Sequence, residues 1–134
     1  MKAFLSIPIL LLTLLFTSCT KTTNEYVQPN QTILIDITPS SWTFSQSTNS
    51  YFITFDVPEI DAAVRDIDGI LVAISGDRTL YEALPNVYSN VSLTYTYSQG
   101  KLTIESQPVG GGQPAFPNAN LRVKIVIVQS SNVS

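Results

Sequence analysis

Histidine is absent from this chain, cysteine occurs once, and charged residues make up only 13% of it. Without histidine the chain cannot build a Ser-His-Asp or Cys-His nucleophilic system, or a zinc site with imidazole ligands. A single cysteine cannot form a disulfide within the chain, so the apolar core must stabilise the fold. These absences predict a protein that is not an enzyme and that holds no metal and no cofactor.

The charge balance argues against nucleic acid as a partner. The 134 residues carry a formal net charge of −3, and basic residues are not clustered. Nucleic-acid-binding domains need a basic patch, and a polybasic cluster is also what draws a protein to anionic lipid. The polar residues are instead largely Ser, Thr, Asn and Gln, as in many exported β proteins.

Residues 1–18 have the layout of a secretory signal peptide. Lys2 supplies a positive start, and an apolar run from Ala3 to Phe16 precedes small residues and Cys19. The run of about 14 residues is shorter than the roughly 20 that a membrane-spanning helix needs. The end of the leader resembles the bacterial lipobox, in which signal peptidase II cuts before a cysteine that carries lipid. Phe16 stands where leucine is usual in that motif.

Lipidation would give the lone cysteine a role, because an unpaired cysteine is otherwise unexpected in an exported protein. We therefore expect lipid, including palmitate, on Cys19, and an outer-membrane protein on the periplasmic face or the cell surface. Thr20 is compatible with this location, because Asp at that position is the familiar inner-membrane retention signal. An ordinary cleaved signal peptide, and an uncleaved anchor or buried helix, stay as alternatives.

Beyond the leader the sequence predicts one domain on a tether. Residues 19–30 are polar and lack periodicity, which predicts a flexible tether. Residues 31–129 show the period-two alternation of strands, and residues 130–134 form a short tail. The 116 residues that follow the leader suffice for one domain with its own core.

Six or seven short strands are expected within residues 31–129. The run from Ile70 to Ile74 is continuously apolar, which predicts a central strand covered on both faces. The strands are expected over residues 33–37, 51–57, 70–74, 79–84, 91–97, 101–105 and 121–128. Turn residues separate them, at Gly76-Asp77 and at Ser98-Gln99-Gly100. The pattern predicts an all-β fold, a single Ig-like antiparallel β-sandwich of about seven strands after the signal-peptide helix.

Two segments depart from the alternation. Residues 60–67 favour a helix of about two turns at most. Residues 106–120 are rich in glycine and proline, and a loop of about 15 residues is uncommon unless it is functional or disordered. Gly110 to Gly112 lack a following Lys-Ser/Thr and a helix, so they do not form a phosphate cradle. The expected core includes Phe55, Val72, Ile74, Ile104 and Ile125.

Strand and turn segments follow one another in a recognisable order. They are Trp42, Tyr51 to Pro58, Asp68 to Val72, Tyr81 to Pro85, Tyr97 to Ile104 and Leu121 to Ile127. This order resembles a group of small Bacteroidetes lipoproteins over roughly Gln31 to Val128. Those proteins are mostly of unassigned function and have no recognised catalytic residues. The resemblance therefore implies a lipoprotein β-domain, and it implies no catalytic activity or catalytic residue for this chain.

Four acidic residues lie close together in sequence: Glu59, Asp61, Asp66 and Asp68. Carboxylates suit Ca²⁺, but an EF-hand loop needs a third acid at two-residue spacing and a distal Glu, which are missing. We interpret the acids as solvated loop charge with Arg65 pairing locally. A calcium site is the alternative.

Aromatic residues are the candidates for ligand binding, namely Trp42, Tyr81, Tyr88 and Phe116. Such rings stack on sugars or anchor protein interfaces. For Trp42 the competing interpretation is burial between the sheets. Tyr95 and Tyr97 share a face with Leu93 and are expected in the core or at its edge.

Together these patterns predict a lipid-anchored cell-envelope lipoprotein that acts as a non-enzymatic structural or protein-interaction module. Its partners would be the membrane, through lipid on Cys19, and an envelope protein or a glycan. A glycan-binding accessory domain of a polysaccharide-uptake system is the first alternative, and a small hydrolase without histidine is the second. An exposed planar row of aromatic residues would favour glycan binding, whereas a deep cleft with convergent carboxylates would favour the enzyme.

Overall fold

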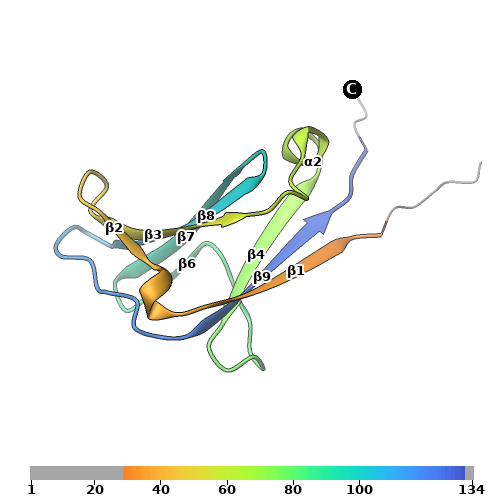
Figure 1. Cartoon of the computed structure of the whole chain (residues 1–134). Coiled ribbons are helices and arrows are strands. Elements are labelled where there is room, and N and C mark those ends of the chain that lie inside the picture. Colours follow the sequence, from red (N-terminus) through yellow and green to blue (C-terminus); the bar gives the residue numbers. More distant parts are fainter. Residues whose placement is uncertain (1–28, 132–134) are drawn as a thin grey trace, which may run out of the picture.

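The computed structural model describes residues 29–131. The predicted leader, Cys19 and nearly all of the predicted tether lie outside the described residues. Two antiparallel sheets pack face to face (Figure 1), so the predicted single β-sandwich is confirmed. The sandwich has nine strands among the described residues, where about seven were expected.

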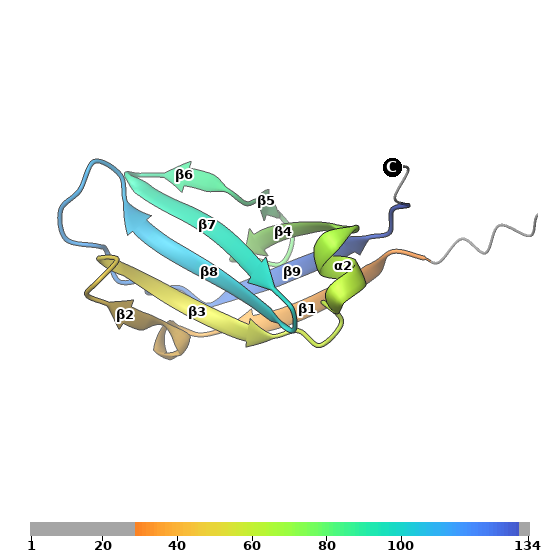
Figure 2. The same cartoon turned by 90° about the horizontal axis from the view of Figure 1, so that it is seen from above.

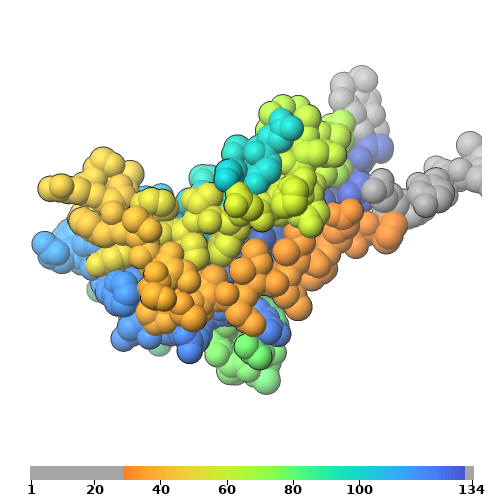
Figure 3. Space-filling view, viewed as in Figure 1, coloured from red at the N-terminus to blue at the C-terminus, as the bar shows by residue number. Residues whose placement is uncertain are grey.

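The two sheets contain four and five strands. The first sheet has the order β1 (Gln31–Ile37), β9 (Leu121–Val128), β4 (Gly69–Ser75) and β5 (Glu82–Ala83). The second has the order β2 (Thr43–Ser45), β3 (Ser50–Asp56), β8 (Lys101–Pro108), β7 (Val91–Ser98) and β6 (Asn86–Tyr88). The first and last strands of the described residues are therefore neighbours, and β1 forms an edge of its sheet (Figure 3).

The core lies between the inner faces of the two sheets. Alternate residues of the strands point into it, as the period-two pattern predicts. The five residues expected in the core, Phe55, Val72, Ile74, Ile104 and Ile125, are all buried. Tyr95 and Leu93 pack against the core at its edge, whereas Tyr97 is exposed.

Strand β4 is buried on one face, and the prediction that both of its faces are covered is wrong. Ile70, Val72 and Ile74 point into the core, but Leu71 points outward with 60% of its surface exposed. The run from Ile70 to Ile74 is continuously apolar because the outer face of β4, which is open to solvent, also carries apolar side chains such as Leu71. Burial on both faces would require a third layer, such as the helices that cover parallel sheets.

The strand expected over residues 79–84 is also wrong in its extent, because β5 contains only Glu82 and Ala83. The chain leaves the first sheet at Leu84-Pro85, a cis peptide bond, and continues into the second sheet as β6. The predicted long loop is shorter than expected, because β8 extends to Pro108. The connection to β9 therefore covers residues 109–120.

The short helix α2 (Ala62–Asp66) lies within the range expected for it. Asp61 caps its first turn, since its carboxylate accepts a hydrogen bond from the Val64 amide at 2.8 Å. Asp66 pairs with Arg65 at 2.7 Å, as expected. Among residues 29–131, His, Cys, Asp and Glu form no group of three that could hold a metal ion. That part of the chain also contains no helix long and apolar enough to cross a membrane.

The sandwich has two distinct ends, which Figures 1 and 2 show on opposite sides of the molecule. At the proximal end strand β1 begins, β9 ends, and α2 lies beside the β7–β8 turn. The distal end is formed by the β2–β3 hairpin, the β6–β7 turn and the loop 109–120. The chain therefore enters the described domain at the end opposite its longest loop.

Candidate functional site

A cavity of about 240 Å³ lies at the distal end, and it brings together three of the four predicted ligand-binding residues. Trp42, Tyr88 and Phe116 all line this distal cavity. Its other lining residues are Ser89, Val91, Leu93, Ser106, Ala115, Pro117, Asn118, Ala119 and Leu121. Three segments that are distant in sequence therefore meet at one site.

Trp42 reaches the cavity from a single turn of 3₁₀ helix, η2 (Pro39–Ser41), that follows β1. Proline at the first position favours this turn because its φ is already fixed in the required range. Only 7% of Trp42 is exposed, which confirms the burial that was the competing interpretation. Its Nε1 is also buried and finds no acceptor among the described residues. An unpaired buried donor is uncommon in folded proteins.

Tyr88 and Phe116 form the accessible wall of the distal cavity. Tyr88 ends β6 and is 74% exposed, and Phe116 in the loop 109–120 is 49% exposed. Tyr88 pairs with Val91 across the hairpin, so its side chain lies on the inner face of the second sheet. The turn between them uses Ser89 and Asn90, both with positive φ, as a tight two-residue hairpin requires.

A chain of aromatic rings extends from Phe116 over the β2–β3 hairpin. The ring of Phe116 meets Tyr51 edge to face with centroids 5.3 Å apart. Tyr51 in turn contacts Phe44 at the same centroid distance. Phe44 is about half exposed, at 48%. Neither Tyr51 nor Phe44 stands out in the sequence as a site residue. Tyr51 has the two-residue spacing of the core residues that follow it in β3, and β2 is too short to show a period.

The loop 109–120 is attached to both neighbouring hairpins. The Val109 amide donates to the Asn90 carbonyl at 2.8 Å. The Asn49 side-chain amide donates to the Gly112 carbonyl at 2.7 Å. The space-filling view shows the loop beside the β2–β3 hairpin at the left end of the molecule (Figure 3). These contacts place Phe116 next to Trp42 and Tyr51.

The fourth predicted residue, Tyr81, does not join the cavity. Its ring makes a cation–π contact with the Lys124 ammonium, whose Nζ lies 3.9 Å from the ring centroid. Lys124 belongs to β9 and pairs with Ala73 of β4, so this contact lies at the first sheet. A cation over an aromatic ring is a stabilising contact in its own right. The structure therefore separates Tyr81 from the other three aromatic residues.

The distal cavity is electrically neutral. Residues 37–55, 83–100 and 106–121 contain no Asp, Glu, Lys or Arg, and every lining residue belongs to one of these three segments. The neighbouring polar groups are hydroxyls and amides, such as those of Ser89 and Asn118. The lack of charge in these three segments is visible in the sequence alone, and it could have indicated that they contribute to one site.

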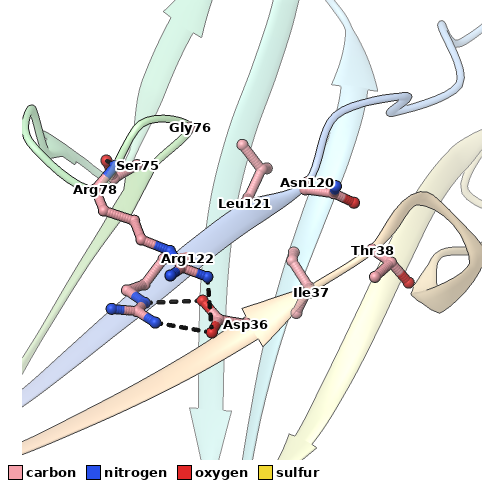
Figure 4. Close-up of a pocket in the computed structure, with 9 residues that line it drawn as sticks. All are labelled: Asp36, Ile37, Thr38, Ser75, Gly76, Arg78, Asn120, Leu121 and Arg122. Atoms are coloured by element: carbon pink, nitrogen blue, oxygen red, sulfur yellow. Dashed lines mark hydrogen bonds and ion pairs between the residues drawn. The ribbon is translucent and has the colours of Figure 1, made fainter.

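A second hollow, of about 280 Å³, lies beside β1 and β9, and charged side chains are among the residues that line it (Figure 4). Arg122 donates two hydrogen bonds to Asp36, both 2.8 Å long. Arg78 approaches the same carboxylate at 3.3 Å. Hydrogen bonding from Arg122 holds the pKa of Asp36 below its ordinary value. Two guanidinium groups thus share one carboxylate, which ties the turn after β4 to the edge of the first sheet.

A third hollow, of about 330 Å³, is bordered by two carboxylates, those of Asp77 and Glu82. Paired carboxylates are the chemistry of glycosidases, so their hydrogen bonds matter for the hydrolase alternative. The Asp77 carboxylate accepts from the amides of Thr79 and Leu80, at 2.8 and 2.9 Å. It also accepts from the Thr79 hydroxyl, and these bonds hold its pKa far below the ordinary value. Asp77 therefore acts as the structural residue of a turn.

Comparison with protein-family models, with curated proteins and with solved structures finds no match to this chain.

Proposed function

We propose that this protein is a lipid-anchored binding module of the cell envelope, without enzymatic activity, that recognises its partner with the distal end. The observation that carries the proposal is the position of the distal cavity. Trp42, Tyr88 and Phe116 meet at the end of the sandwich opposite the start of β1. An anchor at Cys19 would hold the proximal end toward the membrane and leave the aromatic residues facing outward.

Simple dimensions support this arrangement. The seven residues of β1 extend about 23 Å at the rise of a strand. The twelve residues from 19 to 30 reach at most about 40 Å when fully extended. The distal cavity would then lie several tens of ångströms from the lipid surface, where a large partner can approach it.

The character of the distal cavity supports a binding role without turnover. Tyr88 is its one titratable lining residue, and no carboxylate, amine or thiol from the described residues borders it. General acid–base catalysis needs a group that titrates near the working pH. Aromatic rings around a neutral cavity favour recognition of a partner, because they bury a large area with little loss of side-chain freedom.

The anchor is tested by mass spectrometry of the protein isolated from its own membrane. We expect a mature N-terminus at Cys19 that carries acyl chains, and two or more chains are needed for a stable anchor. The variant Cys19→Ala should remain an unprocessed precursor, whereas Ser18→Ala should be processed normally. A mature wild-type protein with an unmodified N-terminus would contradict the proposed anchor.

A further inference from the structure

We propose that the distal cavity binds a neutral sugar unit of a glycan, with further units lying on the aromatic rings of the β2–β3 hairpin. This inference rests on the proposed binding role and specifies the class of ligand. The ligand is an uncharged carbohydrate, and recognition of a protein instead would contradict the inference.

Two aromatic rings at the cavity are accessible to a ligand. Tyr88 is 74% exposed and Phe116 is 49% exposed, so both present aromatic surface at the cavity wall. The C–H face of a sugar ring is apolar and fits against an aromatic face. Phe44 and Tyr51 continue the aromatic surface from Phe116 at 5.3 Å ring spacings. The rings are not coplanar, because Tyr51 is inclined by 54° to Phe44 and by 76° to Phe116. Further sugar units would therefore contact a stepped aromatic surface and not a flat platform.

The residues that line the cavity carry no formal charge. The lining residues of the cavity all come from the three uncharged segments, 37–55, 83–100 and 106–121. Protein interfaces are enriched in arginine beside their aromatic anchors, and none borders this cavity. An acidic sugar or a phosphate would likewise need a cation. The hydroxyl and amide groups of Ser89 and Asn118 match the hydroxyl groups of a neutral sugar instead.

The indole of Trp42 has an unpaired donor. Trp42 lines the cavity, and its buried Nε1 lacks an acceptor among residues 29–131. The neighbouring loop contains three glycines with positive φ, Gly110 to Gly112, and hydrogen bonds to Asn90 and Asn49 attach it to the two hairpins. A sugar oxygen that entered as the loop shifted would supply the missing acceptor.

The cavity also has the right size for a small unit. Its volume of about 240 Å³ is below the roughly 300 Å³ at which sites for drug-sized ligands begin. One ring can therefore enter it, and the remainder of a longer glycan would lie on the surface formed by Phe44 and Tyr51.

Binding can be followed without a label, because Trp42 is the only tryptophan in the chain. The full chain, extracted in mild detergent, is titrated with maltohexaose, cellohexaose and mannohexaose, and with hexagalacturonate as the acidic comparator. A glycan array extends the search to other neutral sugars. We expect a saturable change in Trp42 emission with at least one neutral glycan and weaker binding of the acidic one.

Variants then locate the site. Tyr88→Ala and Phe116→Ala should each weaken binding about tenfold, the size expected for loss of one stacked ring. Tyr88→Phe should retain most of the affinity, because it keeps the ring. Val87→Ala is the matched control, because Val87 is similarly exposed on the same strand but pairs with Ser92 on the opposite face. Its affinity should equal that of the wild type.

The contrary results separate this inference from the proposed function. Binding that Tyr88→Ala and Phe116→Ala leave unchanged would overturn the assignment to the distal cavity. Tighter binding of hexagalacturonate would overturn the neutral ligand. A photo-reactive residue at position 88 is used in parallel on intact cells. Cross-links to an envelope protein, with no glycan bound, would overturn the sugar site and retain the binding module. No glycan and no cross-link would overturn both.

Discussion

The Tyr95 hydroxyl donates a hydrogen bond to the Ile70 carbonyl at 2.7 Å and so joins the two sheets across the sandwich. The reason lies in the short partner of β4. Strand β5 pairs only with Ala73 and Ile74 of β4. The Leu84 amide that follows β5 donates a hydrogen bond to the Val72 carbonyl at 2.8 Å, and among the described residues this is the last backbone bond on this edge of β4 toward its N-terminus. Ile70 lies two residues earlier, so its carbonyl points to the same open edge. Tyr95 supplies the donor that a longer β5 would have provided.

Replacing Tyr95 by Phe should therefore lower the free energy of unfolding by about 1 kcal/mol, since the Ile70 carbonyl loses its partner while the packing of the ring is kept. Urea denaturation measures the change. Tyr97→Phe is the matched control on the same strand, and it should have no effect because Tyr97 is exposed. Equal stability of Tyr95→Phe and the wild type would mean that water satisfies the carbonyl as well as the tyrosine does.

Two apolar residues on opposite faces of β4 should differ greatly in how much they contribute to the free energy of unfolding. Ile74→Ala should lower the free energy of unfolding by about 2–5 kcal/mol, because Ile74 is only 6% exposed and its removal leaves a cavity. Leu71→Ala should change it by less than about 0.5 kcal/mol, because the side chain faces solvent. Thermal or urea unfolding compares the two. A large loss in Leu71→Ala would indicate that a partner or a second copy covers this face.

Acid should weaken the fold partly through Asp77. Because the folded protein holds the pKa of Asp77 below its ordinary value of about 4, the unfolded chain takes up the proton first as the pH falls. Its contribution is complete above about pH 4 and fades toward pH 2. Asp77→Asn should therefore show a smaller loss of stability between these pH values than the wild type. Glu59→Gln, at an exposed position without a hydrogen bond among the described residues, is the control and should follow the wild-type curve.

Deleting Gly110 to Gly112 should alter function more than stability. Shortening the loop changes its closure entropy by only about 0.3 kcal/mol, and the exposed bond from Asn49 to Gly112 adds little. The deletion moves Phe116 relative to Trp42, so the proposed ligand binding should weaken. Unfolding and binding are measured on the same preparation. A stable variant with unchanged binding would show that the loop only connects β8 to β9.

Much of the fold could be predicted because its long strands are buried on one face and exposed on the other. Alternation marks β1, β3, β7, β8 and β9, whose inner residues are the expected ones. The strands β2 and β6 contain three residues each, which is too few for a period to appear. The end of β5 depends on where the chain crosses between sheets, and residues 79–84 do not encode that crossing in their alternation.

The site was harder to predict than the fold. Aromatic residues can be selected from the sequence, but only the pairing of β6 with β7 and the attachment of the loop 109–120 bring Tyr88 and Phe116 to Trp42. Tyr81 has the same chemistry as Tyr88, yet Lys124 on a neighbouring strand occupies its ring. The candidates could therefore be selected by residue type, but only the tertiary contacts show which of them lie at the distal cavity.

The position of β1 has a mechanical consequence. It begins at the proximal end and runs antiparallel to β9 through seven residue pairs, with Asp36 and Arg122 joined near its far end. If the domain is held at Gln31 and pulled through a ligand at the distal end, the force acts along the strand axis. The hydrogen bonds between β1 and β9 are then loaded together in shear instead of being opened one after another. A strand loaded in this way resists mechanical unfolding better than a strand that peels from its end.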